Sequence, residues 1–253
     1  MKTQYEISSG DQIVVANHYI SSASKAHGLV IFLTGDSPSG SKGKLWQLLV
    51  DEFSKDEIDT ITFDFHSQGL SSGDRSELSL TLAIQNFCDV MSFFEKNSIL
   101  SGYKKISAVA ASFGASVLLA TQSLINLWSS VVFKSPASDL PDAYINDIGQ
   151  VENEKWKASG YSEENGLNYT AYTDSQRYDL FHCAEKLISP TLIIQGSEDE
   201  IVLYENTYRL QKIMSNAELF LIPGGKHDYK QEGATEAFVS KCVEYIRNDF
   251  VRD

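Results

Sequence analysis

Short runs of apolar residues recur along the chain and alternate with segments that carry apolar residues at helical spacing. The apolar runs predict strands, at 28–33, 58–65, 106–109, 131–133, 191–195 and 219–222. The segments between them predict helices, at 45–55, 80–96, 116–124, 205–213 and 235–246. Strands that alternate with helices imply a mostly parallel, doubly wound sheet with helices on both faces.

The alternation fails in two places. Near the start, residues 5–7 and 12–20 predict two strands joined at the turn Ser9-Gly10-Asp11, which adds an antiparallel pair and brings the sheet to about eight strands. From 135 to 185 the strand pattern disappears, and Tyr, Trp, Asn and acidic residues dominate. We therefore predict one α/β domain over 1–253, with 135–185 as an irregular cap inserted above the carboxyl edge of the sheet.

Composition is that of an ordinary globular protein, with 42% hydrophobic and 22% charged residues in 253. The three cysteines are widely spaced and predict neither a disulfide framework nor a zinc site. No segment has the apolar length of a signal-peptide core or a membrane span, so we expect a cytoplasmic protein. The formal charge of −13 disfavours nucleic acids and anionic membranes as partners.

A tight corner follows the predicted strand 106–109. The segment Ala110-Ala111-Ser112-Phe113-Gly114 has the small-x-Ser-x-Gly pattern of a nucleophile elbow, in which a strained turn lifts a serine hydroxyl above the sheet. Small residues are needed two positions before and after the serine because the neighbouring backbone passes close by. A helix N-cap formed by Ser112 explains the same residues equally well, so only the residues of the surrounding loops can distinguish a nucleophile from a cap.

Two other loops at strand ends carry the partners that a serine nucleophile needs. Asp199 follows the strand 191–195, and His227 follows the strand 219–222. The order Ser, Asp, His is that of an α/β-hydrolase triad, in which the imidazole takes the hydroxyl proton and the carboxylate orients the imidazole. Asp199 belongs to an acidic turn, and Asp179 and Asp228 remain alternatives to it. The other histidines suit packing or surface roles, although His66 and His182 are within reach of the site mouth.

The predicted oxyanion hole consists of the backbone N–H groups of Phe113 and Asp36. Asp36 is unfavourable at this position, because its carboxylate would repel the developing oxyanion. At roughly 5 Å and an effective dielectric constant near 20, this repulsion raises the energy of the transition state by on the order of 3 kcal/mol. We expect its side chain to turn away or to be paired; otherwise the enzyme is impaired. The mechanism needs no metal and no organic cofactor.

These residues resemble the α/β-hydrolase family, and most of all its compact branch of feruloyl or cinnamoyl esterases and serine-aminopeptidase-like hydrolases. Beyond the triad, the resemblance includes the loop 64–71, similar to the family's D-x-x-G-x-G-x-S, and the segment 190–196 that leads into the acid. The usual His-Gly of the oxyanion loop is Thr34-Gly35 here, and Ser67, Ala110 and Ala111 also depart from the family pattern. The nucleophile, acid and base are retained.

The resemblance implies a serine esterase that acts on a small-molecule carboxylic ester, with aryl or hydroxycinnamoyl esters as candidates. Two alternatives remain open: cleavage of an amide or thioester on the same triad, and a non-catalytic binding role. The oligomeric state, monomer or homodimer, also remains open. Seven aromatic residues of the cap could line a substrate pocket: Tyr144, Trp156, Tyr161, Tyr169, Tyr172, Tyr178 and Phe181. The candidate substrate contacts among them are Trp156, Tyr161, Tyr169 and Tyr172. A small core inside the cap explains them at least as well. The cap carries a formal charge of −7, which disfavours anionic thioesters.

Overall fold

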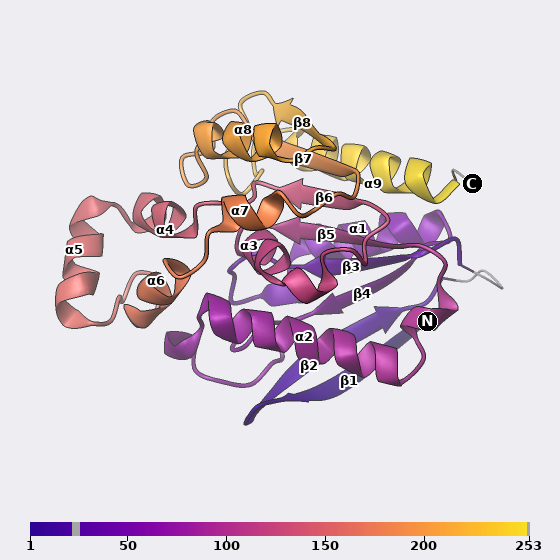
Figure 1. The fold of residues 1–253 in the computed structure, drawn as a ribbon, viewed down its shortest axis with the longest axis horizontal. Coiled ribbons are helices and arrows are strands. Elements are labelled where there is room, and N and C mark those ends of the chain that lie inside the picture. Colours follow the sequence, from indigo (N-terminus) through magenta and orange to yellow (C-terminus); the bar gives the residue numbers. More distant parts are fainter. Residues whose placement is uncertain (22–25, 252–253) are drawn as a thin grey trace.

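The computed structural model describes residues 1–21 and 26–251; residues 22–25 and 252–253 of the predicted domain 1–253 lie outside the described residues. The strands are β1 (Lys2–Ser9), β2 (Gln12–Tyr19), β3 (Leu29–Leu33), β4 (Asp59–Phe63), β5 (Ile106–Ala111), β6 (Val131–Lys134), β7 (Thr191–Gly196) and β8 (Ala217–Ile222). The helices are α1 (Lys44–Lys55), α2 (Leu80–Lys96), α3 (Phe113–Ala120), α4 (Leu140–Ile148), α5 (Gln150–Ser159), α6 (Thr170–Ser175), α7 (Leu180–Ala184), α8 (Tyr204–Ile213) and α9 (Ala234–Val251). Figure 1 shows the helices packed around the sheet.

The described strands form one sheet in the order β1-β2-β4-β3-β5-β6-β7-β8. β2 pairs antiparallel with β1 and with β4, and every pair from β4 through β3 to β8 is parallel. The predicted α/β-hydrolase fold, with a mostly parallel sheet of about eight strands, is therefore confirmed. Because the strands from β3 onward run in the same direction, the loops that follow them open at one edge.

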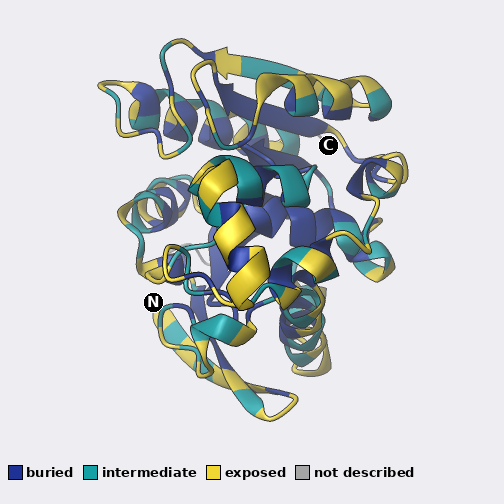
Figure 2. Ribbon diagram, turned by 90° about the vertical axis from the view of Figure 1, so that its left-hand side faces the viewer, coloured by how far each residue is buried: buried dark blue, intermediate teal, exposed yellow. Residues whose placement is uncertain are grey.

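Residues of β3 alternate between two hydrophobic cores, which is why the strand reads as a continuous apolar run. Leu29, Ile31 and Leu33 face the core formed with α2, α3 and α8, whereas Val30 and Phe32 face the core formed with α1 and α9. In Figure 2 the central strands are coloured as buried, whereas the edge strands β1 and β8 and the outer helices carry intermediate and exposed positions. A sheet enclosed on both faces gives its loops a rigid base.

Several elements differ in extent from the sequence prediction: the first strand, expected over 5–7, spans Lys2–Ser9, and the last helix, expected over 235–246, runs from Ala234 to Val251. The helix expected over 116–124 begins at Phe113 and ends at Ala120: Thr121 leaves the helical conformation (φ −83°, ψ 71°), and a separate 3₁₀ turn follows at Gln122–Leu124. The segment 135–185, expected to be irregular, contains the helices α4 to α7. These helices are five to ten residues long, too short to establish a recognisable periodicity in a segment rich in polar residues.

Three sequence expectations concern other parts of the chain. Cys88, Cys183 and Cys242 are all free thiols, and Cys242 is buried. Over residues 1–21 and 26–251, no helix has both the length and the apolar character to cross a bilayer. The same residues contain no group of three or more His, Cys, Asp or Glu side chains arranged to hold a metal ion.

Candidate active site

Five loops at the carboxyl edge of the sheet converge on one site. Ser112 follows β5, Asp199 follows β7 and His227 follows β8. Asp36 follows β3, and Arg75 lies in the long connection after β4. Parallel strands bring these loops together although their residues are far apart in sequence.

Ser112 lies at a sharp corner between β5 and α3. Its φ is 47° and its ψ −116°, a backbone conformation that a non-glycine residue adopts only at a cost of roughly 1–3 kcal/mol. The amide of Ser112 donates to the carbonyl of Lys134 (2.9 Å), which ties the corner to β6. Two residues later, a Cβ added to Gly114 would lie 2.4 Å from the carbonyl oxygens of Leu33 and Thr34. Glycine is therefore required for α3 to approach β3.

The three predicted triad side chains form one hydrogen-bonded line. The Ser112 Oγ lies 3.1 Å from Nε2 of His227, and Nδ1 of His227 lies 2.9 Å from Oδ2 of Asp199. Asp199 Oδ1 accepts hydrogen bonds from the amides of Val202 (2.9 Å) and Ile201 (3.1 Å). The Asp199 side chain is fully buried, whereas that of His227 is 20% exposed. This geometry suits an oriented imidazole base beside a serine hydroxyl.

The loops that carry Asp199 and His227 contact each other directly. A Cβ on Gly196 would lie 2.2 Å from the carbonyl oxygen of Gly225, and the amide of Glu198 donates to the same oxygen (2.9 Å). Burial alone would raise the pKa of Asp199, but the hydrogen bond and charge of His227 and the Val202 amide outweigh burial and lower it. Asp199 is therefore an ionised carboxylate held under the imidazole.

The other acids and histidines considered from the sequence lie elsewhere. Asp228 pairs with Lys230 at the surface, and Asp179 caps the start of α7 through the amide of His182. His66 is buried with Nε2 against the carbonyl of Asp74, while His182 lies beside Glu185 on the exterior. The structure thus brings Asp199, and not these residues, to His227.

The loop after β3 lies against the elbow, as an oxyanion loop must. A Cβ on Gly35 would approach the Cβ of Ser112 to 3.5 Å. The Thr34 hydroxyl donates to Oε1 of Gln68 (3.2 Å), and Nε2 of Gln68 lies 3.4 Å from the Gly35 carbonyl. Gln68 therefore holds the loop in which Thr34 replaces the histidine of the family pattern. Within the described residues, the backbone amides of Asp36 and Phe113 donate to no protein acceptor.

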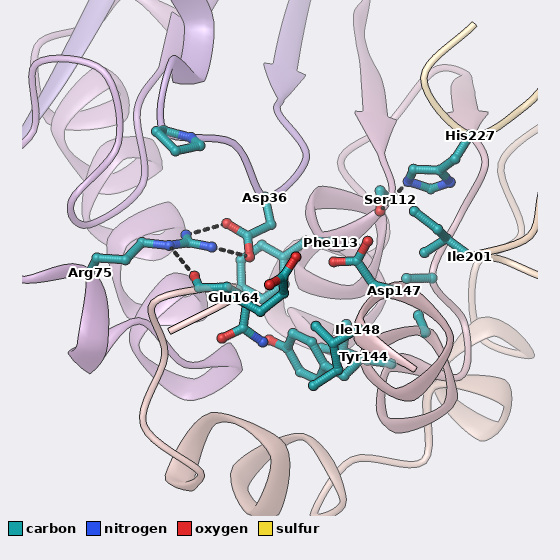
Figure 3. A pocket seen from close by; sticks show the side chains of 15 residues that line it. Asp36, Arg75, Ser112, Phe113, Tyr144, Asp147, Ile148, Glu164, Ile201 and His227 are labelled. Carbon is teal, nitrogen blue, oxygen red and sulfur yellow. Dashed lines mark hydrogen bonds and ion pairs between the residues drawn. The ribbon is translucent and has the colours of Figure 1, made fainter. Parts of the chain in front are cut away.

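The carboxylate of Asp36 forms an ion pair with Arg75. Both guanidinium ends of Arg75 bind it, Nη1 to Oδ1 and Nη2 to Oδ2 (2.8 Å), as Figure 3 shows. Burial lowers the pKa of Arg75, but the hydrogen bonds and charge of Asp36 outweigh burial and raise it, so Arg75 remains charged. Sequence analysis missed Arg75 because a single arginine in a polar loop carries no signal for a partner 39 residues away.

A cavity of about 450 Å³ connects the triad to the segment 135–185. It is lined by Ser112, Phe113 and His227, by Asp36 and Arg75, by residues of α4 that include Tyr144 and Asp147, and by Glu164, Asn165 and Ile201. Figure 3 shows Tyr144 across the cavity from Ser112 and His227.

Of the seven cap aromatics expected to line a pocket, Tyr144 lines this cavity, whereas Tyr178, Phe181 and the four candidate substrate contacts do not. Trp156 is completely buried and packs edge-on against Tyr169 and Tyr172, while Tyr161 is 45% exposed and forms a bridge with Asn168. The prediction is therefore corrected: Trp156, Tyr169 and Tyr172 form a small core inside the segment. An amphipathic aromatic side chain suits either position, so its type alone did not reveal the difference.

Lys134 is a second residue that sequence analysis did not single out. It ends β6, is only 6% exposed, and donates through Nζ to the carbonyl of His227 (2.6 Å). The ammonium also lies 3.9 Å from the ring centre of Tyr229. Burial lowers the pKa of Lys134 to about 8, although Asp199 and Asp228 oppose this shift. A lysine that ends a buried apolar strand is unusual and was the available signal.

Comparison with known proteins agrees with this architecture. Residues 81–251, which include Ser112, Asp199 and His227, match the model of the prolyl oligopeptidase family. No curated protein matches the chain. Several solved structures match nearly its whole length at low sequence identity, and at such identities they show the fold.

The similar structures are esterases and hydrolases. Est1E from Butyrivibrio proteoclasticus, solved with ferulic acid bound, is 19% identical with a TM-score of 0.82 and covers 98% of this chain and 100% of its own. The Pyrococcus furiosus esterase Pf2001 is 17% identical (TM-score 0.75; 98% and 92% covered). Mouse α/β hydrolase domain-containing protein 10 is 15% identical (TM-score 0.76; 97% and 99% covered). The chain therefore belongs to the prolyl oligopeptidase family, on an α/β-hydrolase fold.

Proposed function

We propose that the protein is a serine hydrolase that cleaves small-molecule carboxylic esters through an acyl-enzyme. The observation that carries the proposal is the hydrogen-bonded line from Ser112 Oγ through His227 to Asp199. Membership of the prolyl oligopeptidase family supports hydrolase chemistry. The strained backbone conformation of Ser112 adds support, because such conformations are concentrated at active sites and binding sites.

In the first half-reaction, Ser112 Oγ attacks the ester carbonyl carbon while Nε2 of His227 removes the hydroxyl proton. The C–O bond to the alcohol then breaks, and His227 gives that proton to the leaving oxygen. In the second half-reaction, His227 removes a proton from water, the resulting hydroxide attacks the acyl carbon, and the proton returns to Ser112 as the acid leaves. Asp199 holds Nδ1–H of His227 throughout and stabilises the transient imidazolium.

The amides of Phe113 and Asp36 would bind the oxyanion that forms in each half-reaction. Both lie beside Ser112, and their freedom from protein acceptors supports this role. The Asp36 carboxylate opposes it less than its charge suggests, because Arg75 carries the balancing charge. The proposed chemistry needs no metal or organic cofactor.

A small-molecule substrate with an apolar part suits the cavity, which has room for a ring and a short chain and has apolar side chains of α4 on one wall. The bound ferulic acid of Est1E makes aryl and hydroxycinnamoyl esters the first candidates to test. A peptide or other amide is the second candidate, and the name of the matching family favours it. A panel of methyl hydroxycinnamates, aryl esters of increasing acyl length, proline-containing peptide anilides and acyl thioesters would separate these substrates. We expect higher kcat/KM for the esters; the reverse order would assign the site to amide cleavage.

A fluorophosphonate probe tests whether the triad is catalytic at all. We expect the probe to label the wild-type protein and to fail with Ser112→Ala, because it reacts only with an activated serine. His227→Ala should slow labelling strongly while the circular-dichroism spectrum stays unchanged. Well-folded wild-type protein that resists the probe would replace the enzyme proposal with a binding protein built on a hydrolase fold.

A further inference from the structure

A buried lysine beside the triad has no role in the mechanism described above. Lys134 is 6% exposed and ends β6, which lies between β5 and β7 in the sheet (Figure 1). The two acids whose charge acts on it, Asp199 and Asp228, pair with other residues, and over residues 1–21 and 26–251 its ammonium forms no ion pair. Burying a charge without an ion pair costs free energy that an apolar side chain would avoid. Stability therefore does not explain the lysine.

Lys134 binds the main chain of both reacting residues. Its carbonyl oxygen accepts a hydrogen bond from the amide of Ser112 (2.9 Å), and its Nζ donates to the carbonyl oxygen of His227 (2.6 Å). In the part of the chain that the structure describes, no other hydrogen bond reaches the main chain of His227. A short bond from an ammonium is charge-assisted and roughly twice as strong as one between neutral groups. One residue thus links the segment of the nucleophile to the segment of the base.

The ammonium is itself held in one position. Nζ lies 3.9 Å from the ring centre of Tyr229, and the face of an aromatic ring attracts a cation. Tyr229 is fully buried, and its hydroxyl donates to the carbonyl of Ile194 on β7 (2.9 Å). Although burial lowers the pKa of Lys134 to about 8, the ammonium form still predominates at pH 7. The carbonyl of His227 therefore faces a fixed and charged donor.

The loop that carries His227 has other anchors on either side of it. Before His227, the carbonyl of Gly225 accepts from the amide of Glu198 (2.9 Å). After it, the carbonyl of Tyr229 accepts from the hydroxyl of Thr235 (2.7 Å). These contacts hold the loop and leave the peptide of His227 itself to Lys134. Loss of the lysine contact should release the imidazole while the loop stays in place.

We propose that Lys134 is a positioning residue for the general base. It holds the carbonyl of His227 at the same strand end that binds Ser112, and so keeps the imidazole within hydrogen-bonding distance of the serine hydroxyl. The inference rests on the proposed function, because a base needs positioning only where the triad is catalytic. Displacement of a reacting group by about 1 Å can lower a rate on the order of a hundredfold.

Lys134→Met tests the proposal, because it removes the donor and the charge and keeps a side chain of similar length. We expect kcat to fall by about ten- to a hundredfold with KM within about threefold of wild type, since the contact acts on the base and not on the substrate. The melting temperature at pH 7 should equal that of wild type or exceed it, since an apolar side chain replaces a buried charge. Lys226→Met is the matched control: this exposed lysine immediately precedes His227, and its loss should change neither kcat nor the melting temperature.

Two esters of one acid distinguish a misplaced base from a general loss of structure. The alkoxide of ethyl butyrate must receive a proton from His227 as it leaves, whereas 4-nitrophenolate leaves without one. Lys134→Met should therefore lose about tenfold more kcat/KM on ethyl butyrate than on 4-nitrophenyl butyrate. A smaller folded fraction would lower both values equally.

Chemical rescue supplies a second variant. Lys134→Cys is made in a chain whose own thiols are removed by Cys88→Ser, Cys183→Ser and Cys242→Ala, and the unfolded protein is alkylated and refolded. 2-Bromoethylamine rebuilds the lysine side chain with sulfur in place of Cγ, whereas 1-bromopropane gives the same length with a methyl group in place of the ammonium. At equal folded fraction, the aminoethylated protein should have a kcat about tenfold or more above that of the propylated one.

Three results would overturn the positioning role and leave the hydrolase: a Lys134→Met variant as active as wild type, a loss of rate that is equal on the two esters or follows a loss of folded protein, or equal rates after the two alkylations. Wild-type protein that resists the fluorophosphonate probe would instead remove the proposed function, and the inference with it.

Discussion

Arg75 binds both carboxylate oxygens of Asp36, and with its Nε it also binds the carbonyl of Asn165. One guanidinium thus joins the loop after β3 to the segment that covers the site. Arginine suits this position because its planar fork matches a carboxylate in two bonds and leaves a third donor free. The pairing allows an acidic residue to occupy the oxyanion loop.

Removing Arg75 should expose the charge of Asp36 to the developing oxyanion. At roughly 5 Å and an effective dielectric constant near 20, an unpaired carboxylate costs on the order of 3 kcal/mol, so Arg75→Met should lower kcat on an aryl ester by about a hundredfold. Because the ester's ground state is neutral, KM should change much less. Steady-state kinetics of the variant measures both values.

Two companion variants separate charge from geometry. Arg75→Lys keeps the charge and should retain most of the rate. Asp36→Asn alone should change kcat by less than about tenfold, because the carboxylate is already neutralised, but in the Arg75→Met background it should recover most of the lost rate. If Asp36→Asn fails to rescue Arg75→Met, the loss arises from displaced loops and not from charge.

The imidazole should depend on Asp199 for its orientation. We expect Asp199→Asn to lower kcat by about three to four orders of magnitude, because an amide at this position favours the wrong tautomer of His227. Asp228→Asn is the matched control: this acid is adjacent to His227 in sequence but pairs with Lys230 at the surface. Kinetics of the two variants at equal folded fraction checks the assignment, and a comparable loss in both would contradict it.

Gly114 should tolerate no side chain. A methyl group there would overlap the carbonyl oxygens of Leu33 and Thr34, so the oxyanion loop or α3 must move. Gly114→Ala should reduce the free energy of unfolding by about 1–3 kcal/mol and lower kcat as well. Gly102→Ala is the control, since an added Cβ meets no atom within 4 Å, and its stability should stay within about 0.5 kcal/mol of wild type. Urea denaturation gives both values.

Lys134 should make stability rise with pH in the alkaline range. Its pKa is about 8 in the folded protein and 10.5 when unperturbed, so between these values the unfolded chain binds more protons. The free energy of unfolding therefore increases from pH 8 to 10.5, by on the order of 3 kcal/mol from this group. Lys134→Met should lack the increase. The difference between the two proteins' unfolding free energies, measured by denaturation across this range, isolates the lysine, and a constant difference would refute the shift.

Sequence patterns predicted the frame well because buried parallel strands leave a strong local signal. The runs at 28–33 and 191–195 coincide with β3 and β7 to within one residue. The order of the loops at the strand ends identified Ser112, Asp199 and His227, which form one hydrogen-bonded line. The positions of these loops follow from the parallel sheet, which the pattern itself implied.

The parts of the site and of the fold that were not predicted depend on contacts between residues distant in sequence. Nothing near Arg75 in the sequence specifies Asp36 as its partner, and nothing near Tyr144 distinguishes it from Trp156, which is buried away from the cavity. The helices α4 to α7 are stabilised by packing on one another and on the sheet more than by their own pattern. Local periodicity contains no information about such pairings.

The covering segment leaves the sheet after β6 and returns at β7, and these two strands are neighbours. Its entrance and exit are therefore close together, and the hydrogen-bonded ladder between β6 and β7 closes regardless of what is inserted between them. A different segment grafted at the same two points could give the protein a new substrate range without rebuilding the machinery beneath. Such a segment would have to replace the contacts that the present one makes with the rest of the protein, among them the Asn165 carbonyl that binds Arg75 and the Asp174 carboxylate that binds Thr81.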